Sequence, residues 1–307
     1  MGYQAMLPPG VVVLERGWLS SNNIVIRGRS GAAVVDSGYC THAEQTVELV
    51  AHAAGDRTPQ TLVNTHLHSD HCGGNAALQS RWPGLRTLIP PGLAAAVRNW
   101  DEVALTFVPT GQRCPRFDFQ ETLRPGEAIA LGDLSWEVHA APGHDQHSVI
   151  LFEPTSRTLI SADALWQNGF GIVFQELEGE RAFDEVAATL DLIEGLEPQV
   201  VLPGHGAPFV DVAAALGRAR SRLEAYARGP ARHASHAAKV LLKFKLLEIQ
   251  QVTVADFVAW AESTAYFGLV WRRWFSGTPE ASWIASLLED LVRSGAARIE
   301  NGMLAND

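Results

Sequence analysis

One short stretch, NTHLHSDHCGGN at residues 64–75, most constrains what this chain can fold into. It places four metal-ligand side chains, His66, His68, Asp70 and His71, within six residues. The preceding TLV segment reads as the end of a buried strand, and the Gly-Gly pair begins a bend into a helix. Imidazole nitrogens and carboxylate oxygens suit zinc and similar metals, whereas four such side chains would pack poorly as core. A metal-binding loop is therefore favoured over a polar loop with incidental histidines.

The spacing within this loop also predicts how many ions it serves. His66 and His68 lie two residues apart and can reach one ion together, while Asp70 and His71 would point to a second position. One ion rarely takes all four ligands from so short a loop. We therefore expect two metal ions bridged by a water, with further ligands from elsewhere in the chain.

Three later segments share one pattern, in which an apolar strand is followed by a turn and one ligand-type side chain. They are APGHDQHS with His144, TLISADALW with Asp163, and VVLPGHG with His205. A lone histidine after Pro-Gly is more often a turn residue than a ligand. All three segments, in this order after the first motif, together predict the missing ligands.

These residues carry a family resemblance over about residues 11–210: the chain resembles the metallo-β-lactamase-fold hydrolase superfamily. His66-Leu-His68-Ser-Asp70-His71 matches its HxHxDH signature, and His144, Asp163 and His205 match its later ligands. The resemblance implies an α/β fold, the αββα sandwich of that type. It also implies that His66, His68 and His144 hold one divalent ion, that Asp70, His71 and His205 hold the other, and that Asp163 bridges both. Zinc is the expected metal, with iron or manganese as alternatives.

Composition narrows the class of protein and its partners. The chain has 307 residues, a formal net charge of −10 and three scattered cysteines. No run of about 18 apolar residues suggests a membrane span, and no secretory signal is evident at the start. The cysteines fit free thiols, so a cytoplasmic protein is expected. The acidic balance argues against a nucleic-acid partner and favours a small-molecule substrate.

Several residues outside the ligand set are candidates for orienting the site or contacting substrate. Asp36 ends the strand predicted at 31–36, where an aspartate of the resembled family commonly supports the site by hydrogen bonding; a plain turn aspartate is the alternative. His147, three residues after His144, is a candidate hydrogen-bond donor or substrate contact, against an exposed loop histidine. Trp166 lies in the loop 164–175, which we expect to face the substrate.

The segment 100–120 has no clear period but contains several aromatic side chains. A loop of this length inside a compact domain is uncommon unless it is functional. We therefore interpret it as a lid or pocket wall over the metals, with a packed surface excursion as the alternative.

The chain after Arg228-Gly229-Pro230 is built differently, so we predict a catalytic domain at residues 1–228 and a helical module at residues 229–307. A capping box at Thr253, a helix start near Thr278-Pro279 and a hairpin at Asn301-Gly302 suggest a winged-helix-like module. Similar tails occur on superfamily members that resemble an endoribonuclease subgroup. This tail has eight Lys or Arg and eight Asp or Glu, so it is not a basic nucleic-acid surface.

The aromatic residues of this tail suggest what it packs against. Trp271, Trp274, Phe275 and Trp283 predict packing on the main domain or on a second subunit, as in a homodimer. Tyr266 is a candidate donor to a developing oxyanion, with core packing beside Phe267 as the alternative.

The expected function is a binuclear metal-dependent hydrolase. A metal-bridging hydroxide would attack a small ester, lactone, thioester or amide, with Asp70 accepting or relaying the proton. No GxSxG elbow or Walker-type loop is present to supply a competing mechanism. A phosphodiesterase or nuclease is one alternative. An iron-dependent oxygenase or a non-catalytic ligand-binding member of the superfamily is another.

Overall fold

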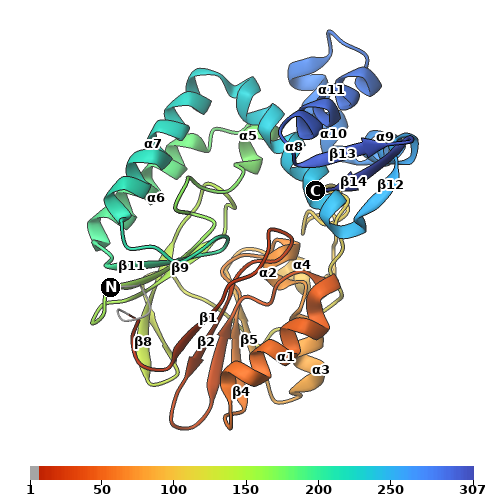
Figure 1. Cartoon of the computed structure of the whole chain (residues 1–307). Coiled ribbons are helices and arrows are strands. Elements are labelled where there is room, and N and C mark those ends of the chain that lie inside the picture. Colours follow the sequence, from red (N-terminus) through yellow and green to blue (C-terminus); the bar gives the residue numbers. More distant parts are fainter. Residues whose placement is uncertain (1–6) are drawn as a thin grey trace.

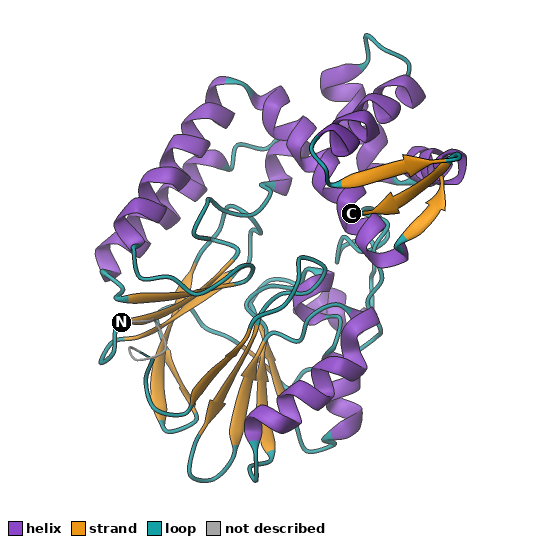
Figure 2. Cartoon of the chain, viewed as in Figure 1, coloured by secondary structure: helices purple, strands orange, loops and turns teal. Residues whose placement is uncertain are grey.

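Two mixed β-sheets stacked face to face form the centre of the molecule in the computed structural model, which describes residues 7–307 (Figure 1 and Figure 2). The six-stranded sheet has the order β1-β2-β3-β4-β5-β6, and the five-stranded sheet has the order β11-β10-β9-β8-β7. The first sheet contains β1 (Val11–Leu14), β2 (Asn23–Arg27), β3 (Ala32–Val35), β4 (Pro59–Val63), β5 (Arg86–Ile89) and β6 (Glu121–Thr122). The second contains β7 (Ala128–Leu131), β8 (Leu134–Ala140), β9 (Val149–Glu153), β10 (Thr158–Ala162) and β11 (Val200–Pro203).

Apolar side chains on both faces of each sheet fix this layered arrangement. Between the sheets, Val35 and Val63 of the first pack in one cluster with Trp136 and Leu202 of the second. The outer face of the first sheet is covered by α1 (Ala43–Ala54) and α3 (Asn75–Arg81). The outer face of the second is covered by α6 (Phe183–Leu196) and α7 (Val212–Arg228). The αββα sandwich predicted from the sequence is confirmed.

The ends of four strands deliver the predicted ligands. β4 runs directly into the ligand loop, β10 is followed at once by Asp163, and β11 is followed within two residues by His205. β8 ends four residues before His144. The ligand loop itself contains one helical turn, α2 (Ser69–Cys72), where an irregular loop was expected. That turn carries Asp70 and His71.

The segment 100–120 contains no helix or strand, as predicted, and follows the short helix α4 (Ala94–Asn99). Its aromatic rings do not face the predicted ligand residues. Phe107 and Phe117 are buried in a cluster with Leu67 and Ile89, so the loop has a small core of its own. This core anchors the loop beside the ligand motif.

The C-terminal residues form a helical module with a small sheet. Its elements are α8 (Pro230–Ile249), β12 (Gln251–Thr253), α9 (Val254–Ser263), α10 (Ala265–Val270), a wide helical turn at Trp271–Phe275, α11 (Glu280–Arg293), β13 (Ala297–Glu300) and β14 (Met303–Asn306). The three strands pair in the order β12-β14-β13. The predicted cap is present, because the Thr253 hydroxyl accepts a hydrogen bond from the Asp256 amide. Asn301 and Gly302 both have positive φ angles, as a two-residue hairpin turn requires.

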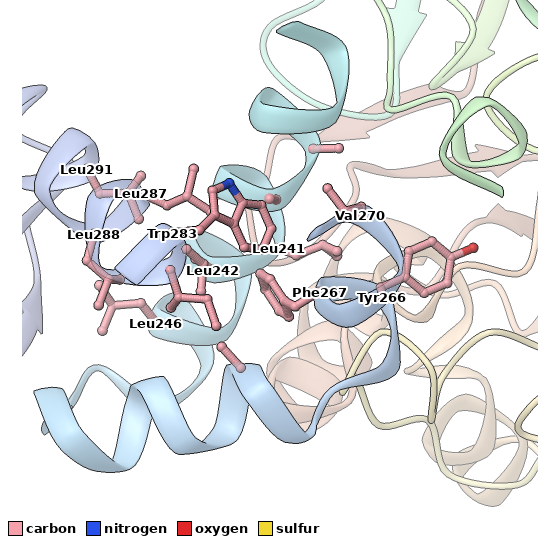
Figure 3. Close-up of a cluster of buried hydrophobic side chains, with 14 of the residues drawn as sticks. Leu241, Leu242, Leu246, Tyr266, Phe267, Val270, Trp283, Leu287, Leu288 and Leu291 are labelled. Atoms are coloured by element: carbon pink, nitrogen blue, oxygen red, sulfur yellow. The ribbon is translucent and has the colours of Figure 1, made fainter. Parts of the chain in front are cut away.

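The hydrophobic core of the module, which Figure 3 shows around Leu242, Phe267, Trp283 and Leu288, also includes Ile172 and Leu177 of the main domain. The prediction that its tryptophans pack on the main domain or on a partner is wrong for Trp283. That ring is buried in the module core and stacks on Phe275 at 5.2 Å between centroids. Trp271 and Trp274 pack against the same cluster. The module needs these rings because its helices and a three-stranded sheet must share one small core.

Polar and aromatic contacts join α8 to the sandwich. Phe244 packs edge-on against Tyr39, with 5.1 Å between ring centroids. Glu248 accepts a hydrogen bond from the Arg113 side chain, in the 100–120 loop, at 2.8 Å. The amide of Val173, in the loop after β10, donates to Nε2 of the buried His233 at 3.1 Å. Among residues 7–307, no helix is long and apolar enough to cross a membrane.

The His233 contact makes part of the folding stability depend on pH. Burial lowers the pKa of His233 to about 3, against an ordinary value of 6.5. A depressed pKa contributes stability that is complete above pH 6.5 and is lost as the pH falls toward 3. We predict that the free energy of unfolding of the wild type, minus that of His233→Gln, falls by on the order of 2 kcal/mol between pH 6.5 and pH 5. Urea denaturation at both pH values measures this difference, and a constant difference would contradict the prediction.

Candidate metal centre

Three histidines form the first ligand group. His66, His68 and His144 each offer a ring nitrogen, and these nitrogens all lie within 4.8 Å of one another. The Nε2 atoms of His66 and His144 are 3.3 Å apart. Such an approach of lone-pair nitrogens in a buried place is unfavourable unless a proton or a cation lies between them.

A second ligand group lies beside the first. Asp70, His71 and His205 offer ligand atoms within 4.8 Å of one another, and so do His66, His71 and Asp163. His205 Nε2 is 3.1 Å from the Asp70 carboxylate. His71 Nε2 is buried and has no hydrogen-bond partner among the described residues. A buried, unpartnered nitrogen among other ligand atoms is an arrangement that suits metal binding.

Asp163 lies between the two groups. One carboxylate oxygen is 3.4 Å from His71 Nε2, and the other is 3.4 Å from His144 Nε2 and 3.9 Å from His205 Nε2. The indole N–H of Trp166 donates to the same carboxylate at 3.2 Å. The side chain therefore faces ligands from both groups, which is the position that a bridging carboxylate would take.

Hydrogen bonds behind the rings decide which nitrogen points inward. Nδ1 of His71 donates to Asp36 Oδ2 at 2.8 Å, and Nδ1 of His144 donates to the carbonyl of Ile172 at 2.6 Å. Asp36 also accepts from the amide and the hydroxyl of Thr65. It adopts a left-handed φ of 58°, which is uncommon for a residue other than glycine. The carboxylate of Asp36 accepts three hydrogen bonds while its backbone is strained, which indicates that Asp36 is positioned to orient His71.

Burial and charge prepare these groups for a cation. Burial lowers the pKa of His68 and of His144 to about 4, so both rings are neutral at pH 7. Burial would raise the pKa of Asp163, but His205 and His71 hold it well below its usual value. The pKa of His71 itself is raised well above normal because Asp163 and Asp36 outweigh its burial.

These pKa shifts indicate that the site has too little positive charge to balance its buried carboxylates. Among the described residues, Asp36, Asp70 and Asp163 pair with histidines, and none pairs with a lysine or arginine. Five imidazoles and two carboxylates form a donor set suited to zinc or a similar borderline metal. The residues present therefore fit divalent metal, which would neutralise the carboxylates and displace the proton from His71.

The ligand groups lie at the floor of a cavity of about 660 Å³, a volume typical of small-molecule sites. The 100–120 loop lines it with Thr106, Thr110 and Gln112 rather than with its aromatic rings. Most of the predicted substrate-facing loop 164–175 lines it as well. A second cavity of about 270 Å³ meets the first at His68, His144 and Phe174.

The remaining candidates lie in different places. Trp166 is beside the ligands, as described above. His147 lines only the second cavity, where its amide donates to Asp145 at 2.8 Å. Tyr266 also lines that cavity, but its hydroxyl donates to Glu178 and its ring packs on Phe174. Tyr266 is therefore held by a partner of its own rather than directed at the ligand groups.

Phe174, in the loop predicted to face the substrate, packs edge-on against His68 with 5.1 Å between ring centroids. Trp18 was not anticipated from the sequence: it stacks on the ring of His205 with 5.3 Å between centroids. It lies far from every ligand in the sequence, so no local motif identifies it. Residues of α8 also line the cavity, including Val240 and Phe244.

Comparison with known proteins agrees with this geometry. The model of the metallo-beta-lactamase superfamily matches residues 16–205. A hydroxyacylglutathione hydrolase of Anaeromyxobacter dehalogenans is 31% identical over 209 residues, covering 67% of this chain and 69% of that protein. The human acyl-coenzyme A thioesterase MBLAC2 is 29% identical over 225 residues, covering 63% and 76%. The match to a hydroxyacylglutathione hydrolase of Mesorhizobium japonicum spans only 38% of that protein's length.

Solved structures show the same fold. A metallo-beta-lactamase family protein from Thermus thermophilus superposes with a TM-score of 0.58 at 20% identity, over 98% of this chain and 99% of that one. A beta-lactamase domain protein from Burkholderia ambifaria gives the same TM-score at 22% identity, over 87% and 88%. The family model covers more than half of the chain, including all seven ligand-type residues at the strand ends. On this sequence match and this fold, the chain belongs to the metallo-beta-lactamase superfamily.

Proposed function

We propose that this protein is a hydrolase that uses two divalent metal ions to cleave small acyl esters, with thioesters as the favoured class. The observation that carries the proposal is the position of Asp163 between the two ligand groups, at the floor of a substrate-sized cavity. The relatives named hydroxyacylglutathione hydrolase and acyl-coenzyme A thioesterase support the thioester over a lactone or an amide.

The proposed metal ligands follow the two groups. His66, His68 and His144 would hold one ion, Asp70, His71 and His205 the other, and Asp163 would contact both. Zinc is proposed on the donor set, with iron or manganese as alternatives. When bound, such a pair supplies a hydroxide at neutral pH and polarises the substrate carbonyl.

The chain's own residues would transfer the proton and exclude water. Asp70 lines the cavity, with its Oδ2 3.1 Å from Nε2 of His205, and its carboxylate would take a proton and return it to the departing thiolate. Trp18 and Phe174 cover the ligand rings and exclude water from their faces. Attack of hydroxide on the acyl carbon would form the new carbon–oxygen bond, and the carbon–sulfur bond would break. The departing thiolate would take the proton from Asp70 and leave as the thiol.

The C-terminal part is proposed as a separate module, residues 229–307, attached to a catalytic domain of residues 1–228. The element order of helix, strand, helices and two final strands supports the winged-helix likeness. Its equal numbers of acidic and basic residues do not favour the nuclease alternative. We propose that it completes the substrate pocket.

A substrate panel tests the proposed function. The zinc-loaded protein is assayed with S-lactoylglutathione, acetyl- and octanoyl-coenzyme A, a lactone and a chromogenic phosphodiester. We expect turnover of at least one thioester, with kcat/KM at least 100 times that for the phosphodiester. Turnover of the phosphodiester alone would replace the proposal with the nuclease alternative.

The support that Asp36 gives to His71 predicts a measurable loss. Asp36→Asn should weaken metal binding and lower kcat/KM by about 10–100-fold, since residues that orient a metal ligand commonly contribute that much. Titration with a metal-binding dye measures the affinity. Asp56→Asn, at an exposed aspartate, is the matched control and should change neither quantity. Wild-type metal affinity in Asp36→Asn would show that Asp36 acts only in the turn.

A further inference from the structure

One face of α8 continues the wall of the metal cavity. His236, Val240, Phe244 and Leu247 line the cavity at spacings of four, four and three residues, which place them on one side of a helix. Leu242 and Leu246 point to the opposite side, into the module's own core (Figure 3). The helix therefore has two apolar faces, and the module core accounts for only one of them.

The cavity-lining face is apolar and partly open. Val240 is 36% exposed, and across the cavity Trp18 is 60% exposed, both unusual for large apolar side chains. Phe174, which packs edge-on against His68, also packs against the cluster that contains Ile172 and Leu241 of α8, and all three residues line the cavity. A continuous apolar path thus leads from the ligand histidines to α8.

The polar groups on this wall are largely occupied or neutral. Lys243 Nζ donates to the Ala296 carbonyl and to Asn306 Oδ1, so its charge is held at the end of the module. Burial lowers the pKa of His236 to about 4, which leaves that ring neutral at pH 7. Arg222 of α7 and Lys243 are the basic side chains of the wall, and no ion pair with an acidic side chain is found for either among the described residues.

The second cavity is smaller and contains acidic side chains. It begins at the same histidines, His68 and His144, and Asp145, Glu178 and Glu180 line it together with apolar residues such as Leu67 and Leu105. Three acidic side chains in a cavity of about 270 Å³ make a poor environment for an alkyl chain. Of the two cavities that meet at the ligand groups, only the larger suits an apolar group.

We infer that the face of α8 formed by Val240, Phe244 and Leu247 is the subsite for an apolar acyl chain, so the favoured substrates carry medium or long acyl groups. The inference rests on the proposed thioester hydrolase. The acyl carbonyl would lie at Asp163, and the chain would run past Phe174 to α8. The C-terminal module would then select the acyl chain rather than bind a macromolecule.

A chain-length series tests this subsite in the full-length, zinc-loaded protein. N-acetylcysteamine thioesters from acetyl to dodecanoyl vary the acyl group while the uncharged thiol stays constant. In the wild type, kcat/KM should rise about fourfold per added methylene until the cavity is filled. Val240→Asp should lower the ratio of dodecanoyl to acetyl kcat/KM at least tenfold. Val240→Trp should shorten the chain length at which kcat/KM stops rising.

Val210→Asp is the matched control, because Val210 is 45% exposed and does not line the cavity. It should keep the wild-type dependence on chain length, and melting temperatures should show that all three variants fold. A flat series in the wild type would overturn the subsite while leaving the thioesterase proposal intact. A steep series that both Val240 variants retain would overturn it as well.

Absence of any thioester turnover would count against the proposed function, and a binding measurement then tests the subsite separately. Calorimetry with S-dodecyl-N-acetylcysteamine, an uncleavable thioether, should show binding at least tenfold weaker in Val240→Asp than in the wild type and in Val210→Asp. Equal binding by all three proteins would overturn the inference.

Discussion

Asp163→Asn should lower kcat/KM at least 100-fold and leave the protein with less than its full metal content. The side chain lies 3.4 Å from a ring nitrogen of His71 and 3.4 Å from one of His144, so it faces both ligand groups. An amide has nearly the same shape but no charge, and two cations at the spacing of a binuclear site need an anion between them. Residues that only orient a metal ligand commonly contribute about 10–100-fold to metal affinity or activity, so a ligand that serves both ions should contribute more.

The expected loss is chemical rather than structural. The substituted amide side chain has the size of the native carboxylate, and its carbonyl oxygen could still accept from the Trp166 indole. The circular dichroism spectrum of Asp163→Asn should therefore match the wild type, while elemental analysis shows the missing metal. Asp184→Asn, at an exposed aspartate on α6, is the control. Full activity with wild-type metal content in Asp163→Asn would show that Asp163 is only a strand-end residue.

A chain that ends at Gly229 should be poorly soluble, and its soluble fraction should lose at least 100-fold in activity on any thioester that the whole protein cleaves. Truncation removes α8, against which Ile172 and Leu177 of the main domain are buried. It also removes the Phe244 contact with Tyr39 and one wall of the substrate cavity. The new surface would be a contiguous apolar patch beside the site, and such patches promote aggregation.

Soluble yield, metal content and turnover of the truncated chain measure this prediction against the full-length protein. A truncated chain that folds, binds metal and turns over normally would contradict it. Tight binding of DNA or RNA at physiological salt by residues 230–307 alone would contradict it in another way, since the module would then serve a nucleic acid.

Much of the fold and most of the candidate ligands could be predicted from the sequence because the ligand signals are local. His66 to His71 follow one strand without interruption, and His144, Asp163 and His205 each follow another strand. Strands that run in the same direction end at a common edge of their sheet, so side chains placed just after them come close together once the two sheets stack. The proposed support by Asp36 followed only from the family resemblance. Its left-handed φ and its contact with His71 depend on a neighbour 35 residues away.

The cavity walls could be predicted only in part. Phe174 lies in the loop that was expected to face the substrate, but Trp18 and Val240 come from distant segments, and the packing of the module on the sandwich brings Val240 to the cavity. The prediction for Trp283 was wrong, because aromatic content does not tell which of two cores a ring will enter. Trp283 lies on the inward face of α11 and fills the module's own core.

Metal stoichiometry tests the central claim most directly. The full-length protein is reconstituted with zinc, freed of excess ion by gel filtration and analysed for metal and protein in the same sample. The arrangement of two ligand groups around Asp163 predicts close to two ions per chain, falling to about one or fewer in Asp163→Asn. No bound metal after reconstitution, or one ion per chain that is unchanged when Asp163 and His205 are replaced, would contradict it.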